Sequence, residues 1–396
     1  MKRALPAIML GLLVAPPALA GFADALRDTK PDFNIRYRFE TVDQDGIEKN
    51  ARASTAKVRL SWIMPADEGL SFGFEVDQVL LLPPGSGQKF NSTENGNTQY
   101  PIVADPLGFD LNQVFLRYRG DGLTLTAGRQ RILHSEQRFL GGGAFRQNEQ
   151  TYDGLRLQYS RGMASLDYTY IINVNRIFGP GDGAQPGDWK GDTHAFRGEL
   201  KPAEGHTLGA FAYLMDFEND NGPANSNSTY GVDYTAGMGP FSLTGTLARQ
   251  SDYADNPASY DATYYSVEAR WKQDSMTFTG GYAVLGSDGG EAAFKTPLGT
   301  LHKFQGWTDR FLGTPLNGVA DAYVTVSSQT GPVSVTLAYH DFQAERGGAD
   351  YGYEIGAMLN WKINDNFDAQ LKFADYSAKE HATDITKFWL IFSYRI

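Results

Sequence analysis

Apolar and polar residues alternate along most of this chain, in runs of about ten residues that begin near Phe33 and continue to the C-terminus. Alternation with a period of two places unlike side chains on the two faces of a β-strand. We count eighteen such runs, among them 53–64, 263–272 and 353–362. In 53–64, one face carries Ala56, Val58, Leu60 and Trp62, and the other carries Thr55, Lys57, Arg59 and Ser61.

The connections between these runs alternate in length. Short ones such as 239–240 contain Gly, Pro, Asn or Asp, which suit tight turns. Short turns on one side and long loops on the other are typical of bacterial outer-membrane barrels, and no propeller-blade repeat is present. The sequence therefore predicts an all-β fold, a transmembrane up-and-down antiparallel β-barrel of about eighteen strands with short periplasmic turns and long extracellular loops. Long connections are 80–108, 130–150, 175–192 and 286–318.

Aromatic residues recur where strands approach the short turns. Rings at that depth favour the membrane interface, so we expect them to form the periplasmic girdle. The chain end also alternates, up to Ile396, and resembles the C-terminal assembly signal of outer-membrane barrels, which usually ends in Phe. We therefore expect outer-membrane lipid and the barrel-assembly machinery as partners. The six aromatic positions are Trp62, Tyr118, Tyr159, Trp271, Trp361 and Tyr394.

The N-terminus has the pattern of a secretory signal peptide. Lys2 and Arg3 precede an apolar run, and Ala18-Leu19-Ala20 is a small-residue cleavage pattern. We expect residues 1–20 to be removed near Ala20, residues 21–32 to form a periplasmic segment, and residues 33–396 to form the barrel. The predicted location is the outer membrane of a Gram-negative bacterium.

Composition narrows the function further. The 396 residues include no cysteine, which excludes disulfides and thiolate metal sites. The formal net charge of -11 argues against nucleic acid as a partner. The acidic residues within 179–192 leave weak calcium binding open, but they match no calcium-loop spacing, so we predict no metal site and no cofactor.

Eighteen strands enclose a lumen too wide for side chains to fill, so loops must narrow it. Loop 130–150 combines several arginines and two glutamates with apolar residues such as Ile132 and Phe139. Such a loop can pack its apolar side on the wall and direct its charges into water. We predict that it folds inward as a constriction, where guanidinium groups attract carboxylates.

Candidate pore and substrate-binding residues come from this loop, its flanking strands and the long extracellular loop 286–318. For loop 286–318, sugar binding and a simple extracellular cover are equally open interpretations. The alternative for the strand charges is cross-strand pairing that stiffens the wall. The candidates are Arg129, Arg131, Arg138, Arg146, Glu149, Asp153, Arg156, Lys303 and Arg310.

Three stretches, Gly128–Ile132, Gln137–Phe139 and Arg146–Asp153, together with the segment Thr296–Leu312, resemble the alginate-export family of outer-membrane porins. The resemblance implies an eighteen-stranded barrel whose electropositive constriction passes an acidic polysaccharide. It also implies a constriction role for the motif positions. The classical alginate exporter of that family has an Asn-Val-Gly-Trp-like stretch where this chain has Gly142–Phe145. The resemblance therefore does not identify the solute. The motif positions are Arg129, Arg131, Arg138, Arg146, Glu149 and Asp153.

The predicted function is an outer-membrane channel for small or polymeric anionic solutes, acidic saccharides such as uronates first. The alternatives are a general non-specific porin, an adhesin or receptor without a pore, and an outer-membrane hydrolase. For the hydrolase, His340 and Asp341 are the best candidate pair, but adjacent strand residues point to opposite faces. No Gly-x-Ser-x-Gly motif is present, so we expect no enzymatic activity and no catalytic residue.

Overall fold

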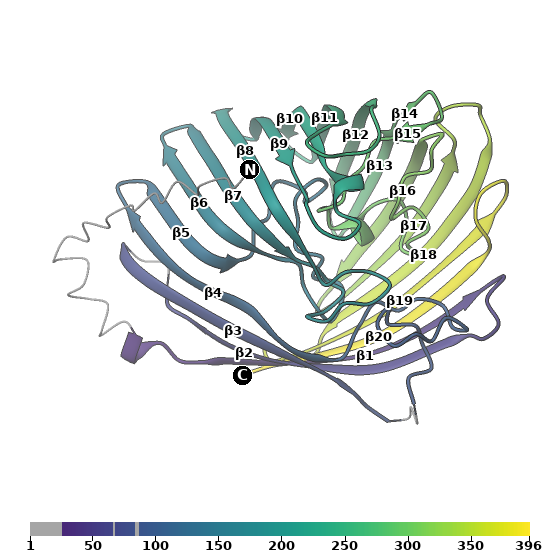
Figure 1. The fold of residues 1–396 in the computed structure, drawn as a ribbon, viewed down its shortest axis with the longest axis horizontal. Helices are drawn as coiled ribbons and strands as arrows, with labels where there is room; N and C mark the ends of the chain where they lie inside the picture. Colours follow the sequence, from purple (N-terminus) through teal and green to yellow (C-terminus); the bar gives the residue numbers. More distant parts are fainter. Residues whose placement is uncertain (1–25, 66–67, 84–86) are drawn as a thin grey trace.

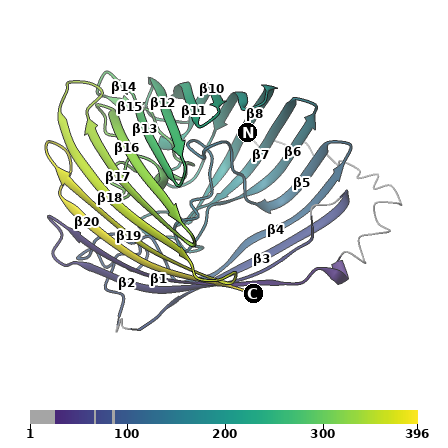
Figure 2. The same ribbon diagram turned by 180° about the vertical axis from the view of Figure 1, so that it is seen from behind.

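The computed structural model describes residues 26–65, 68–83 and 87–396. The expected signal peptide 1–20 and most of the expected segment 21–32 lie outside these residues. Eighteen strands pair with their neighbours along the chain, all antiparallel, and β20 (Ile385–Arg395) pairs with β1 (Asp32–Gln44) to close the sheet. Figures 1 and 2 show this seam, where purple β1 lies beside yellow β20. The predicted up-and-down β-barrel of eighteen strands is confirmed.

The strand bounds agree with the alternating runs of the sequence. The run 53–64 corresponds to β2, 263–272 lies within β12, and 353–362 lies within β18. No helix in the described ranges is long and apolar enough to cross a membrane. Besides β1 and β20, the barrel strands are β2 (Ala51–Ile63), β3 (Gly69–Leu81), β4 (Gly108–Gly120), β5 (Leu123–Gln130), β6 (Thr151–Arg161), β7 (Ala164–Asn175), β8 (Asp188–Ala203), β9 (His206–Met215), β10 (Asn227–Met238), β11 (Phe241–Asp252), β12 (Asp261–Gln273), β13 (Met276–Leu285), β16 (Val319–Thr330), β17 (Val333–Gln343), β18 (Asp350–Lys362) and β19 (Phe367–Ala378).

The connections define two ends of the barrel. Turns such as 239–240 and 331–332 form the short-turn end. β1 begins and β20 ends at this same end of the barrel. The long-loop end carries 87–107, 131–150 and 286–318, and the last of these contains β14 (Ser287–Asp288), β15 (Ala292–Ala293) and η2 (Leu301–Lys303). A short helix, η1 (Pro223–Asn225), lies in the loop between β9 and β10.

The alternation of the sequence separates the two faces of the wall. On β2, Leu60 and Trp62 are 40% and 36% exposed, whereas Lys57 is 3% exposed. An outer face of aliphatic and aromatic side chains suits lipid, and a closed sheet leaves no backbone group without a hydrogen bond. Near the short turns, Trp271 stacks on Phe241 and Phe278 of the flanking strands, with ring centroids 6.0 and 5.4 Å apart.

Loop 286–318 does more than cover the barrel. Its residue Asp309 pairs with Lys387 of β20, and its Trp307 ring lies against Gly356 of β18. These partners lie on the inner face of the wall. Part of the loop therefore reaches into the barrel, because its aromatic and charged side chains contact residues of the inner wall.

Aromatic rings cover several glycines on the inner face. A Cβ added to Gly281 would lie 2.2 Å from Cζ of Tyr323, whereas one added to the adjacent Gly280 would meet nothing within 4 Å. We predict that Gly281→Val lowers the free energy of unfolding by about 1–3 kcal/mol, because the phenol must move. Gly280→Val is the matched control. Urea unfolding in detergent micelles measures both, and equal midpoints for the two variants would contradict the prediction.

Candidate functional site

Loop 131–150 crosses the lumen from one side of the wall to the other. Its Phe139 ring packs on Phe211 of β9 and Tyr264 of β12, with centroids 4.9 and 5.3 Å apart. Further along the loop, Phe145 approaches Trp389 of β20, with centroids 5.9 Å apart. Since β9, β12 and β20 lie on different parts of the wall, the loop lies inside the barrel and narrows it (Figure 1).

Two arginines of β1 hold the tip of this loop. Arg36 Nη1 donates to the Ala144 carbonyl at 2.9 Å, and Arg36 Nη2 donates to the Arg146 carbonyl. Arg38 Nη1 donates to the Phe145 carbonyl. Hydrogen bonds from charged donors are stronger than neutral ones, so the wall fixes the course of the loop backbone.

Glu149 anchors the C-terminal end of the loop. Its carboxylate lies 2.7 Å from Arg59 Nη1 and 2.5 Å from Arg131 Nε, and Arg131 also pairs with Glu75 of β3. Burial alone raises the pKa of Glu149, but Lys57, Arg131 and Arg59 together hold that pKa well below its usual value. The carboxylate is therefore charged, and its negative charge is balanced by the cations Lys57, Arg59 and Arg131.

Arg146 joins both inward loops to the wall. Its guanidinium lies 3.0 Å from Glu40 of β1 and 3.1 Å from Asp309 of loop 286–318. Asp309 in turn lies 2.9 Å from Lys387 Nζ on β20. Breaking one partner of a buried ion pair costs about 3–5 kcal/mol, so this chain of charges fixes the two loops relative to the wall.

His302 connects the loop tip to the wall. Its ring stacks on Phe145 with centroids 3.6 Å apart, its Nδ1 lies 2.7 Å from Asp309 Oδ1, and its Nε2 lies 2.7 Å from Lys372 Nζ. Burial, and then the Lys372 charge, lower the pKa of His302 to about 3. The ring is therefore neutral, with Nδ1–H donating to Asp309 and Nε2 accepting from Lys372.

Two cavities meet at the loop tip. The larger, of about 700 Å³, lies among the long loops and is lined by Phe145, Arg146, His302 and Arg310. The smaller, of about 440 Å³, extends toward the short turns and is lined by Arg36, Ala144 and Phe145. Because Phe145 lines both, its ring marks the boundary between them. We call this boundary, with Arg36, Arg146 and His302, the constriction.

Several predicted candidates lie in this interior. Arg131, Arg146 and Glu149 belong to the ion-pair networks described above. Arg138 is also buried, donates to Gln305 Oε1 at 2.6 Å, and lies 4.6 Å from the centroid of the Phe304 ring. It has no carboxylate partner among the residues that the structure describes, and burial lowers its pKa.

The other candidates have local partners. Arg156 pairs with Asp167 of the next strand at 2.5 Å, as the cross-strand alternative proposed. Lys303 pairs with Glu136 and is half exposed at the loops. Arg310 lines the larger cavity and donates to Thr383 Oγ1 at 3.0 Å.

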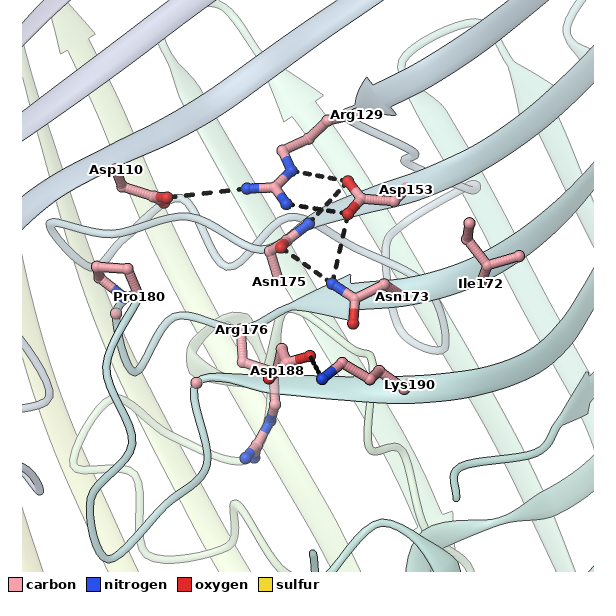
Figure 3. A pocket seen from close by; sticks show the side chains of 12 residues that line it. Asp110, Arg129, Asp153, Ile172, Asn173, Asn175, Arg176, Pro180, Asp188 and Lys190 are labelled. Carbon is pink, nitrogen blue, oxygen red and sulfur yellow. Dashed lines mark hydrogen bonds and ion pairs between the residues drawn. The ribbon is translucent and has the colours of Figure 1, made fainter. Parts of the chain in front are cut away.

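Arg129 and Asp153 do not line the lumen. They are paired in the β5–β6 ladder and share their face with Leu155, which is 59% exposed on the outer wall. Figure 3 shows Arg129 with Asp153 and their neighbours Asp110, Asn173 and Asn175. The expected pore role of Arg129 and Asp153 is corrected, because they are in phase with the outward residues of their strands.

The sequence does not place Phe145, His302 and Lys372 together at a constriction. The inward phase of β1 and β19 predicts that Arg36 and Lys372 face the lumen, but no local pattern places them next to loop residues 70 or more positions away. The sequence suggests only Asp341 as a partner for His340. His340 instead lies 2.9 Å from Asp321 of the neighbouring strand.

No family model matches this chain, and no curated protein matches its sequence. Solved structures do match. The crystal structure of Pseudomonas aeruginosa OpdK with vanillate is 12% identical over 94% of this chain and 99% of that chain, with a TM-score of 0.70. For P. aeruginosa OccK9 (OpdG) the identity is 15% over the same shares, with a TM-score of 0.69.

P. aeruginosa OccD3 (OpdP) is 14% identical over 92% of this chain and 91% of that chain, with a TM-score of 0.66. This chain has the fold of these barrels. It is the closed antiparallel barrel of outer-membrane porin structures. The comparisons give no support to the alginate-export resemblance, which depends on the motif residues alone.

We predict that His302 makes folding stability depend on pH. Its pKa of about 3 lies below the ordinary 6.5, so the unfolded chain binds more protons between these values. The stability contribution of His302 is complete above about pH 6.5 and is lost as the pH falls toward 3. In His302→Asn, urea midpoints in detergent micelles should fall less between about pH 7 and pH 4 than in the wild type.

His206→Asn, at a half-buried histidine near the short turns whose ring contacts Tyr234, is the control for this experiment. It should keep the wild-type pH dependence. An unchanged pH dependence in His302→Asn would contradict the assignment of a neutral, buried imidazole.

Proposed function

We propose that this protein is an outer-membrane channel through which small or polymeric anionic solutes diffuse, selected by cationic side chains at the constriction. The observation that carries the proposal is the meeting of two cavities at Phe145, beside Arg36 and Arg146. A pore needs a continuous path with a narrow, charged section that a solute can both enter and leave.

The charge balance at the constriction favours anions. Arg36 donates only to the Gln147 amide oxygen and to backbone carbonyls, and no carboxylate among the described residues lies within ion-pair distance of it. Lys372 likewise contacts His302 Nε2 and the faces of aromatic rings. The carboxylates Glu40 and Asp309 are already shared with Arg146. The local field therefore attracts a passing carboxylate.

Flat groups on the solute suit the walls of the constriction. The rings of Phe145, His302 and Trp307 are near Lys372, and a guanidinium can hold a carboxylate through two parallel hydrogen bonds. Vanillate, found in the OpdK structure, is an aromatic carboxylate. The motif resemblance supports uronates instead. Both are anions with a flat or ring-shaped body, and both belong to the proposed solute class.

The proposal includes export and insertion. Residues 1–20 would direct the chain across the inner membrane, with cleavage near Ala20, and the barrel-assembly machinery would insert the strands into outer-membrane lipid. The apolar outer wall and the aromatic residues near the short turns support this location.

We predict that Arg36→Gln reduces anion preference. Planar-bilayer recordings in a salt gradient should show a wild-type reversal potential of the anion-selective sign, and Arg36→Gln should lower the anion-to-cation permeability ratio several-fold because an unpaired cation is lost. Arg129→Gln removes the same charge from the outer wall and should leave the ratio unchanged. A wild-type preference for cations, or equal effects of the two variants, would contradict the proposal.

We predict that Phe145→Ala increases single-channel conductance. The ring lines both cavities, so its removal widens the boundary between them. Phe241→Ala removes a ring from the outer wall and should leave conductance unchanged. If Phe145→Ala conducts like the wild type, the narrowest section lies elsewhere.

Blockade of the current identifies the solute class. Glucuronate, vanillate and a neutral disaccharide would be added in turn to the same recordings. The two acids should interrupt the current more than the neutral sugar does, and Arg36→Gln should weaken their effect. Equal blockade by all three would favour a general, non-specific porin.

A further inference from the structure

Two hollows lie side by side on the outer face of the wall, near the long-loop end. The first, of about 540 Å³, is lined mainly by polar residues of β4, β7, β8 and loop 176–187, including Asp110, Asn175 and Lys190 (Figure 3). The second, of about 440 Å³, is lined mainly by apolar residues. Both hollows include Arg129, Asp153 and Ile172, so they form one continuous surface. The apolar lining includes Leu111, Val114, Leu155 and Tyr170.

Irregular strand pairing shapes this part of the barrel. The register shifts at Glu75/Val76 between β3 and β4, at Asp153/Gly154 between β6 and β7, and at Ile171/Asn173 between β7 and β8. Such bulges bend a strand and redirect side chains. They allow polar and apolar side chains to share the outer face at this depth.

The polar hollow combines closely paired groups with groups whose ion pairs are long. Asp153 accepts from Arg129 Nε at 2.7 Å, from Arg129 Nη2 at 2.9 Å and from Asn175 Nδ2 at 3.1 Å, which makes a rigid base. Lys190 is different, because its side chain is 69% exposed and its Nζ lies 3.7 Å from Asp188. Asp110 lies 3.9 Å from Arg129 Nη1. Both long contacts leave room for hydrogen bonds to a ligand.

Along the barrel axis, the polar hollow and the apolar hollow follow each other as the headgroup and the acyl chain of an amphiphilic molecule do. The apolar hollow lies nearer the middle of the wall, beside Leu155 and Ile172, which are 59% and 52% exposed. The polar hollow lies toward the long loops, where β7 ends at Asn175 and β8 begins at Asp188. A headgroup at the membrane surface and an acyl chain along the wall would occupy the two hollows together.

We propose that these hollows bind one phosphorylated glycolipid of the outer leaflet, with its sugar phosphate at Lys190 and an acyl chain against Leu155 and Ile172. Ammonium groups hold phosphate as point charges, whereas carboxylate and amide groups such as Asp110 and Asn175 suit sugar hydroxyls. Both signs of charge and amides in one hollow fit this headgroup better than a simple anionic phospholipid. The inference depends on the proposed outer-membrane location of the channel.

The test is a binding titration of the whole protein in mild detergent, followed by native mass spectrometry. The probe is bisphosphorylated hexa-acyl lipid A, and parallel samples receive phosphatidylglycerol or a mixture of inorganic phosphate and glucosamine. Lys190→Gln should weaken lipid A binding about fivefold. Ile172→Trp places an indole ring in the surface that both hollows share, and it should weaken lipid A binding about tenfold.

Matched controls lie on β11, a few strands away on the outer wall. Arg249 pairs with Asp261 at 2.6 Å and is exposed like Lys190, and Leu247 is 55% exposed like Ile172. Arg249→Gln and Leu247→Trp should bind lipid A as the wild type does. The expected result is one lipid A per barrel, tighter than phosphatidylglycerol, with no binding of free phosphate and glucosamine.

Several results would overturn the inference. They are an absence of one-to-one binding, equal affinity for phosphatidylglycerol, equal losses in the control variants, and a second protein copy covering the hollows in place of lipid. Bilayer conductance of the same samples separates the two hypotheses. Loss of lipid binding with normal conductance rejects this inference alone, whereas an absence of conductance in the wild type rejects the proposed function.

Discussion

Buried charge pairs between the loops and the wall determine what this barrel encloses. Eighteen strands leave a lumen that wall side chains cannot fill, and a polar loop enters it only if its charges find partners there. Arg146 finds Glu40 and Asp309, and Glu149 finds Arg59 and Arg131. These pairs place the loop tip between two cavities, which is where we propose the charged narrow section of the channel.

The fold could be predicted from the sequence because neighbouring residues determine it. A two-residue alternation specifies which side chains face lipid, and turn residues specify where strands end, so the strand number and the long connections agree with the structure. The same rule explains the correction at Arg129. It is in phase with Leu125 and Ala127 on the outer face, although it is only two positions from Arg131. Arg131 reaches the lumen because the chain leaves the sheet after Gln130.

The site was only partly readable, because it depends on contacts between distant segments. The charges of loop 131–150 indicated a polar interior, and the structure places that loop inside. The stacking of Phe145 on His302 and the contact of His302 with Lys372 join residues from two loops and a strand. No periodicity encodes these contacts. The inward contacts of loop 286–318 could not be predicted either, since its partners on β18 and β20 are far away in the sequence.

The central claim is that the tip of loop 131–150 is the wall of an open ion path. The chain has no cysteine, so Ala144→Cys introduces a single thiol at an exposed tip position that lines the smaller cavity. Single-channel recording of this variant, during addition of a negatively charged methanethiosulfonate reagent, tests the claim most directly. The account predicts an irreversible stepwise fall in conductance together with weaker anion preference. Complete modification of the thiol with unchanged conductance would contradict it.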